Sequence, residues 1–191
     1  GTINDDIDPA IDAGVDLFCV AIHCTEADVT KQHIEYLRKK NKETYVPGGA
    51  GNVANNIASL GAKATLVGVV GKDLKGKTLL ALLKQKKINV SNIITLSTRP
   101  TIVKERIVSG NNQLLRIDQE DTRNLAIAEE KKLLNLVRNE IKKCDVVILA
   151  DYAKGLFSET FTTEAIKLAK KNKKKIIVDL TPETKNYFKG V

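Results

Sequence analysis

Short apolar runs alternate with helical patterns along most of this sequence, and this alternation constrains the fold more than any other feature. The apolar, strand-like runs cover residues 16–22, 64–70, 146–150 and 176–179. Helix-like patterns cover residues 26–42, 52–60, 74–86, 125–143 and 160–172; the first of these is polar and helix-prone, and residues 74–86 are amphipathic. Continuous apolar strands joined through helices are typical of a parallel sheet that is covered on both faces. The sequence therefore predicts an α/β layered fold.

The segment after residue 90 departs from this alternation. Residues 101–108 and 113–117 are β-prone, and Gly110-Asn111-Asn112 lies between them. Glycine and asparagine tolerate the positive φ that tight hairpin turns require. We therefore expect a β-hairpin here.

Charge and composition exclude several classes of function. The 191 residues carry 31 Lys+Arg against 23 Asp+Glu, a net charge of +8. With only four Tyr and four Phe, and none within a basic stripe, the chain lacks the stacking surface that single-stranded nucleic acids use. No apolar run is long enough to span a membrane, and the acidic N-terminus does not resemble a secretion signal. We expect no nucleic-acid or membrane partner and a cytoplasmic location.

The cysteines do not indicate a metal site. Cys19, His23 and Cys24 lie close together, but their spacing matches no zinc pattern and no fourth ligand is evident. Cys144 makes the total odd and too small for a disulfide framework. We interpret the strand cysteines as buried thiols and predict no metal ligands.

One segment matches the phosphate-binding pattern G-x-x-x-x-G-K-[ST]: Gly71, Gly76, Lys77 and Thr78 occupy its fixed positions. It follows a strand and opens a helix, so as a P-loop it would place Lys77 on the phosphates and Thr78 on Mg²⁺. However, Asp73 lies inside the loop, where a carboxylate would repel a phosphate. We keep a P-loop NTPase as the alternative hypothesis.

A second glycine-rich turn, Gly48-Gly49-Ala50-Gly51, also opens a helix. Paired glycines let the backbone approach a ligand, and the first turn of a helix presents N–H groups. The Asn52 side chain can both donate to and accept from a hydroxyl, which suits a sugar. A close-packed turn without a ligand is equally compatible with the pattern.

Several segments together resemble the ribokinase-like (pfkB) carbohydrate kinases. The first runs from Gly48 through Ala54, and the resemblance continues in Ser59-Leu60-Gly61-Ala62 and Val67-Gly68-Val69-Val70-Gly71. Residues 98–106, 112–118 and Asp151-Tyr152-Ala153-Lys154-Gly155 are similar in particular to the heptose-phosphate kinase domains of bifunctional ADP-heptose synthases. The resemblance extends over residues 47–191 in the family's order.

This resemblance implies ATP- and Mg²⁺-dependent phosphorylation of D-glycero-β-D-manno-heptose 7-phosphate at O1, a step towards the lipopolysaccharide core. By similarity, Gly48, Gly49 and Asn52 would contact sugar hydroxyls. Lys104, Arg106 and Arg116 are candidates for the 7-phosphate, with exposed strand charge as the alternative interpretation of each. Asp151 and Lys154 follow a strand of the predicted sheet, where ligands of α/β folds gather. A kinase of another sugar remains possible.

The sequence also departs from the family pattern. The family's Gly-Ala-Gly-Asp motif, which carries the catalytic base, and its Asn-x-x-Glu motif are both missing from these residues. Leu180-Thr181-Pro182 replaces the Pro-Lys-Gly usual in heptose kinases, and residues 1–46 match no family segment. We therefore expect an incomplete ribokinase-like domain over residues 47–191 that is inactive by itself and holds no catalytic residue, with a homodimer as a candidate assembly.

Overall fold

A five-stranded parallel sheet forms the centre of the protein. The computed structural model describes residues 17–21, 45–109 and 112–191. The strands follow the order β3-β2-β1-β6-β7, and every neighbouring pair is parallel. Their bounds are β1 (Leu17–Ala21), β2 (Thr65–Gly71), β3 (Asn89–Leu96), β6 (Val146–Ala150) and β7 (Lys175–Asp179). The four apolar runs of the sequence are thus all strands of one sheet.

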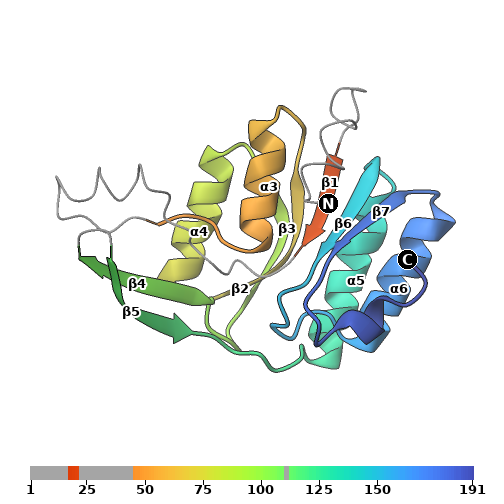
Figure 1. Ribbon diagram of the computed structural model, residues 1–191. Coiled ribbons are helices and arrows are strands. Elements are labelled where there is room, and N and C mark those ends of the chain that lie inside the picture. Colours follow the sequence, from red (N-terminus) through yellow and green to blue (C-terminus); the bar gives the residue numbers. More distant parts are fainter. Residues whose placement is uncertain (1–16, 22–44, 110–111) are drawn as a thin grey trace.

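Two pairs of helices cover the sheet, one pair on each face (Figure 1). On one face lie α3 (Ala50–Ser59) and α4 (Leu74–Gln85). On the other lie α5 (Ile127–Ile141) and α6 (Glu159–Lys171). This arrangement confirms the predicted α/β layers, with helix ends within a few residues of those expected.

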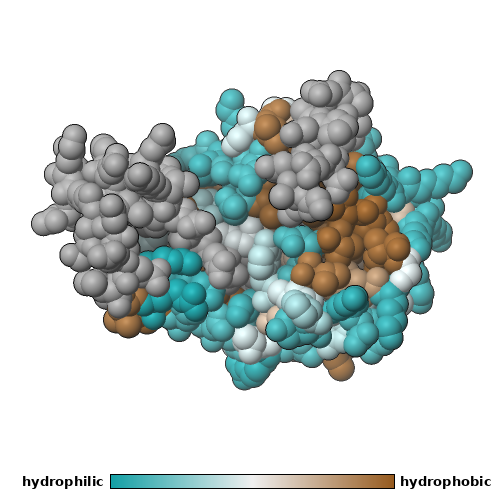
Figure 2. Space-filling model, in the orientation of Figure 1, coloured by the Kyte–Doolittle hydropathy of each residue, from teal (hydrophilic) through white to brown (hydrophobic). Residues whose placement is uncertain are grey.

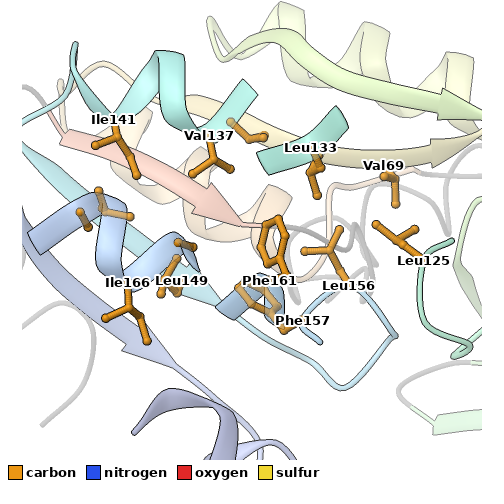
Figure 3. Packing of buried hydrophobic residues seen from close by; sticks show 14 of the residues in the cluster. Val69, Leu125, Leu133, Val137, Ile141, Leu149, Leu156, Phe157, Phe161 and Ile166 are labelled. Atoms are coloured by element: carbon orange, nitrogen blue, oxygen red, sulfur yellow. The ribbon is translucent and has the colours of Figure 1, made fainter. Parts of the chain in front are cut away.

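Strand residues alternate between two separate apolar cores. In β2, Leu66 and Val70 pack towards α3 and α4, whereas Val67 and Val69 pack towards α5 and α6. On the second face, Leu133, Val137 and Ile141 recur every four residues along α5 and meet Phe157 and Phe161 (Figure 3). Because successive strand side chains point to opposite faces, an unbroken apolar run is what a sheet buried on both faces requires.

Strand β3 (Asn89–Leu96) is not predicted by the sequence analysis. Its buried positions alternate, at Val90, Asn92, Ile94 and Leu96, and the exposed positions between them are mostly polar. Among the described strands, β3 pairs with β2 alone and so lies at an edge of the sheet. Such a strand lacks the continuous apolar run that marks the central strands, so its signal in the sequence is weak.

The predicted hairpin is confirmed as a two-stranded antiparallel ribbon of β4 (Val103–Ser109) and β5 (Asn112–Gln119), separate from the main sheet. Its turn, residues 110–111, lies outside the described residues. In the register, Lys104 is opposite Asp118 and Arg106 is opposite Arg116. Alternation places these four charged positions on one face of the ribbon, and places Leu115 and Ile117, 51% and 47% exposed, on the other.

At the far edge of the sheet, β7 pairs only with β6, so its other backbone edge has no strand neighbour among the described residues. The side chains of Ile176, Ile177 and Val178 are only partly buried. Figure 2 shows apolar surface where β6 and β7 lie in Figure 1. After β7, the short 3-10 helix η1 (Lys185–Phe188) places Phe188 against Phe157, with ring centroids 5.4 Å apart.

Some expectations concern segments that the structure does not describe. The helix expected over residues 26–42 and the grouping of His23 with Cys24 both lie outside the described residues. Within the described ranges, no group of three or more His, Cys, Asp or Glu side chains is arranged to hold a metal ion. Cys144 is a free thiol in the core, and burial raises its pKa to about 11.

Candidate functional site

The turn before α3 is closely packed and has no side-chain cap. Gly48 and Gly49 are buried, and Gly49 adopts a φ of 48°, a conformation that favours glycine. The Gly48 carbonyl accepts from the Gly51 N–H at 2.9 Å, and the Gly49 carbonyl accepts from the Asn52 N–H at 2.9 Å. Asn52 lies in the first turn of the helix and is exposed. Among the residues that the structure describes, only backbone groups cap this helix, and no carboxylate lies in its first turn.

The turn before α4 differs because Asp73 fills it. One Asp73 carboxylate oxygen accepts from the Gly76 N–H and from the Thr101 hydroxyl, both at 2.7 Å. The other oxygen accepts from the Thr101 N–H, also at 2.7 Å. The Thr101 hydroxyl in turn accepts from the Gly71 N–H at 2.9 Å. The protein's own carboxylate thus occupies the position where a P-loop would hold a phosphate.

Neighbouring atoms also leave little space around the two glycines of this turn. A Cβ at Gly71 would lie 2.3 Å from the Thr101 nitrogen, and one at Gly76 would lie 2.4 Å from the Gly71 carbonyl oxygen. Lys77 is exposed, and the Thr78 hydroxyl donates to the Leu74 carbonyl at 3.0 Å within the helix. Glycine is needed here for close backbone packing, and this arrangement argues against the P-loop alternative.

The electrostatics of Asp73 agree with a structural role. Partial burial raises the pKa of its carboxyl, but hydrogen bonds from the Thr101 N–H, the Gly76 N–H and the Thr101 hydroxyl outweigh this effect. The net result is a pKa below the ordinary value of 3.8. Asp73 therefore stays ionised as the N-cap of α4, where the helix dipole also favours a negative charge.

A second group of charges lies on the ribbon. The Asp118 carboxylate contacts the Lys104 ammonium at 3.0 Å and the Arg116 guanidinium at 2.9 Å. These contacts lower the pKa of Asp118, and the hydrogen bond from Lys104 is the largest cause. Arg106 and Arg116 are register partners, and like charges opposite each other repel. Together with Lys104, these two arginines concentrate positive charge on this face of the ribbon.

The turn after β6 contacts this group of charges through an ion pair between its Lys154 and Glu120. One oxygen of the Glu120 carboxylate lies 2.8 Å from the Lys154 ammonium and 3.8 Å from the Lys104 ammonium. The Lys104 and Lys154 side chains are only 8% and 17% exposed. The structure thus brings Lys104, Arg116 and Lys154, predicted from separate segments, to one cluster of charges.

Asp151 begins the same turn and is buried. Its carboxylate accepts from the Ala153 N–H at 2.9 Å, which holds Ala153 at a φ of 53°. Burial raises the pKa of Asp151, although hydrogen bonds from the Thr184 hydroxyl and the Ala153 N–H act in the opposite direction. Next to it, Tyr152 donates to the Asp179 carboxylate at 3.1 Å. Acidic groups therefore lie together at the carboxyl ends of β6 and β7.

The segment that leaves the ribbon packs directly on this turn. Gly155, at a φ of 76°, approaches so closely that a Cβ there would lie 2.0 Å from the Arg123 carbonyl oxygen. The Leu125 N–H donates to the Gly155 carbonyl at 3.1 Å. The buried guanidinium of Arg99 donates to the carbonyls of Asp121 and Arg123 at 3.0 and 2.6 Å. The exit of the ribbon and the turn after β6 thus form one packed unit.

Sequence reasoning missed the acidic members of this cluster, Asp118 and Glu120. Arg116, Asp118 and Glu120 alternate along the end of β5, so the signal that they share one face is present in the sequence. Their partner Lys154 lies on a different segment, which no local pattern connects to the ribbon. No described contact joins Gly48, Gly49 or Asn52 to these charges, so their role in one site remains a prediction.

No helix among the described residues is long and apolar enough to cross a membrane. Residues 16–190 match the model of the pfkB family carbohydrate kinases. This match includes β1 and begins inside the segment that the sequence analysis leaves unassigned.

Among curated proteins, the chain is 44% identical over 148 residues to the bifunctional protein HldE of Helicobacter pylori strain HPAG1. It is 38% identical over 149 residues to the protein of the same name from Sulfurimonas denitrificans. These alignments cover 78% of this chain but only 32% and 31% of the two relatives. The chain therefore spans about a third of the length of these relatives.

Solved structures show the same fold at low sequence identity. A possible 1-phosphofructokinase from Thermotoga maritima aligns with a TM-score of 0.69 at 18% identity, over 90% of this chain and 56% of that one. Phosphofructokinase-2 from Escherichia coli aligns with a TM-score of 0.59 at 17% identity, over 91% of this chain and 57% of that one. Fold and family model agree: the chain belongs to the pfkB family of carbohydrate kinases.

Proposed function

We propose that this protein is a kinase of a phosphorylated sugar, and that its substrate is D-glycero-β-D-manno-heptose 7-phosphate, phosphorylated at O1 for ADP-heptose and lipopolysaccharide core synthesis. The family supports a sugar kinase. The segments that resemble heptose-phosphate kinases, and the identity to proteins named HldE, support this substrate. In this proposal the described residues supply the sugar-binding part of the enzyme.

One observation carries the proposal of a phosphorylated substrate: Lys104 and Lys154, from separate segments, both contact a single oxygen of the Glu120 carboxylate. Lysine binds phosphate as a point charge, and arginine adds paired hydrogen bonds. Arg106 and Arg116 lie on the same face of the ribbon. Two ammonium groups that already share one anionic oxygen are suited to hold a phosphate.

The turn at Gly48 and Gly49 would hold the other end of the sugar. Its glycines allow close approach to the backbone, and the exposed amide of Asn52 can bond to a hydroxyl in either direction. Asp151 would accept a hydrogen bond from a further hydroxyl. Its burial lowers the local dielectric, so such a bond is stronger there than in water.

The family resemblance implies ATP and Mg²⁺, but this proposal assigns no described residue to either of them. Asp73 fills the turn that matches the P-loop pattern, and no group of three or more metal-ligating side chains exists among the described residues. The motif that carries the family's base is missing from these 191 residues. We therefore derive no step of phosphoryl transfer from this chain, and a kinase assay on these residues alone tests the prediction that they show no turnover.

A homodimer is part of the proposal, because Leu115 and Ile117 leave an exposed apolar face on the ribbon. A second copy could bury this face. Sedimentation should show a dimer in the wild type and a monomer after Ile117→Lys. A monomeric wild-type protein would contradict this part of the proposal.

Calorimetric titration tests the substrate. Heptose 7-phosphate should bind, and the unphosphorylated heptose should bind at least about tenfold more weakly, since it lacks the charge that the lysines recognise. Lys104→Met should remove most of this difference, whereas Lys63→Met, an exposed lysine away from the ribbon, should not. Equal affinity for the two sugars would contradict the phosphate role of Lys104.

A further inference from the structure

Glu120 links the ribbon to the turn after β6, whereas the ion pairs of Asp118 stay within the ribbon. Asp118 pairs with Lys104 and Arg116, both on the ribbon itself. Glu120 contacts the same Lys104 and also Lys154, which belongs to the turn after β6. Both contacts use the same carboxylate oxygen, so the two ammonium groups converge on one point.

The proximity of the two lysines does not depend on Glu120. The ribbon exit is held on the turn by the hydrogen bond from Leu125 to Gly155 and by the close approach of Gly155 to Arg123. These contacts involve backbone atoms. Removing the charge of Glu120 should therefore leave the lysines close together, but without their shared counter-ion.

We propose that Glu120 is a built-in counter-ion of the phosphate site, which a phosphate dianion displaces when substrate binds. This inference rests on the proposed function, since it concerns the same two lysines. A carboxylate carries one negative charge, whereas a phosphate monoester carries about −1.5 to −2 at pH 7. The exchange therefore favours the phosphate.

This exchange would make Glu120 a residue that determines specificity. An unphosphorylated sugar offers no charge to replace the carboxylate, so the Glu120 ion pairs stay intact and exclude it. The Lys104 and Lys154 side chains of these ion pairs are largely buried, which limits the screening of their charges by salt. Glu120 thus raises the preference for a phosphorylated ligand, while it weakens the binding of every anion.

The test measures the binding of inorganic phosphate and of heptose 7-phosphate to the 191-residue protein by calorimetry. Glu120→Gln keeps the shape of the side chain and removes its charge. It should bind inorganic phosphate about three- to fivefold more tightly than the wild type, the size expected for a partly exposed ion pair. Glu159→Gln removes the same charge from an exposed position on α6, away from the ribbon, and should leave the affinity unchanged. Adding Lys154→Met to Glu120→Gln should abolish the gain.

The outcomes separate this inference from the proposed function. Equal or weaker phosphate binding by Glu120→Gln, with its melting temperature unchanged, would overturn the counter-ion role even if heptose 7-phosphate binds the wild type. An equal gain in Glu159→Gln would also overturn it, since the effect would then be one of net charge. Tighter phosphate binding by Glu120→Gln alone, without any binding of heptose 7-phosphate, would support the counter-ion and contradict the proposed substrate.

Discussion

Two glycine-rich turns open neighbouring helices on the same face of the sheet, and they are built in opposite ways. The turn before α4 holds the Asp73 carboxylate, which accepts three hydrogen bonds from Gly76 and Thr101. The turn before α3 has no side-chain cap and no acidic residue in its first helical turn. The turn that matches a phosphate-binding pattern is therefore closed to phosphate, whereas no carboxylate of the described residues caps the other turn.

This difference shows what a sequence pattern leaves out. The P-loop pattern specifies glycines, a lysine and a hydroxyl residue, but it does not restrict the four positions between the glycines. Asp73 occupies one of these positions, and its partner Thr101 comes from a distant segment. One unrestricted residue thus changes the turn from an anion site into a helix cap.

The largest effect should come from adding a methyl group to the filled turn. In Gly71→Ala, the new Cβ would lie 2.3 Å from the Thr101 nitrogen and 2.7 Å from the Pro100 carbonyl carbon, both backbone atoms that cannot move aside cheaply. We expect a loss of about 3 kcal/mol in the free energy of unfolding, measured by urea denaturation. Gly61→Ala is the control: it has a φ of 94° but no atom within 4 Å, so it should lose only about 1 kcal/mol. Equal losses would contradict the tight packing of this turn.

Removing the carboxylate should have the next largest effect. Asp73→Ala loses the N-cap of α4 and leaves the Thr101 N–H without its acceptor, so we expect a loss of about 2 kcal/mol. Because the pKa of Asp73 is lowered on folding, its ionised form stabilises the protein above pH 3.8, and this contribution falls as the pH drops through the folded value. The stability difference between wild type and Asp73→Asn should therefore shrink between pH 6 and pH 3. A constant difference would show that the charge has no role.

Asp151 should behave in the opposite way, which sharpens the contrast between a structural and a ligand-binding acid. Burial raises its pKa, so its ionisation destabilises the fold as the pH rises above 3.8. Asp151→Asn keeps an acceptor for the Ala153 N–H. At pH 7 this variant should be at least as stable as the wild type in urea, while heptose 7-phosphate binds about tenfold more weakly. A large loss of stability at pH 7 would assign Asp151 to the fold instead.

The smallest effect should follow Lys77→Ala. Lys77 is exposed and the turn beside it is filled, so stability should change by less than about 0.5 kcal/mol. The affinity for heptose 7-phosphate should not change, as calorimetry can verify. Loss of tight Mg-ATP binding in this variant would restore the P-loop alternative.

The central fold was predictable because its signals are local. Continuous apolar runs such as residues 146–150 indicate strands buried on both faces, and the periodic pattern over residues 125–143 indicates an amphipathic helix. Strand β3 (Asn89–Leu96) was missed because its apolar residues neither form a continuous run nor alternate strictly with polar ones: Asn92 is polar but buried, and Ile93 and Ile94 are adjacent.

The candidate site was predictable only in part. The sequence analysis named the cations Lys104, Arg116 and Lys154 from their residue types and the family resemblance, and the structure places them in one cluster, but their binding role stays a prediction. Their partner Glu120 was not found, because the pairing depends on how the ribbon exit packs on the turn after β6. Tertiary contacts of this kind leave no periodic signal in one sequence.

The most direct test of the account is to map the backbone amides that respond to heptose 7-phosphate by two-dimensional NMR. We predict that amide signals shift in the turn before α3, residues 48–53, and around Lys104, Glu120 and Lys154. The amides of residues 71–78 should stay unchanged, because Asp73 and Thr101 already occupy that turn. Shifts confined to residues 71–78 would contradict the account and assign the ligand to the other turn.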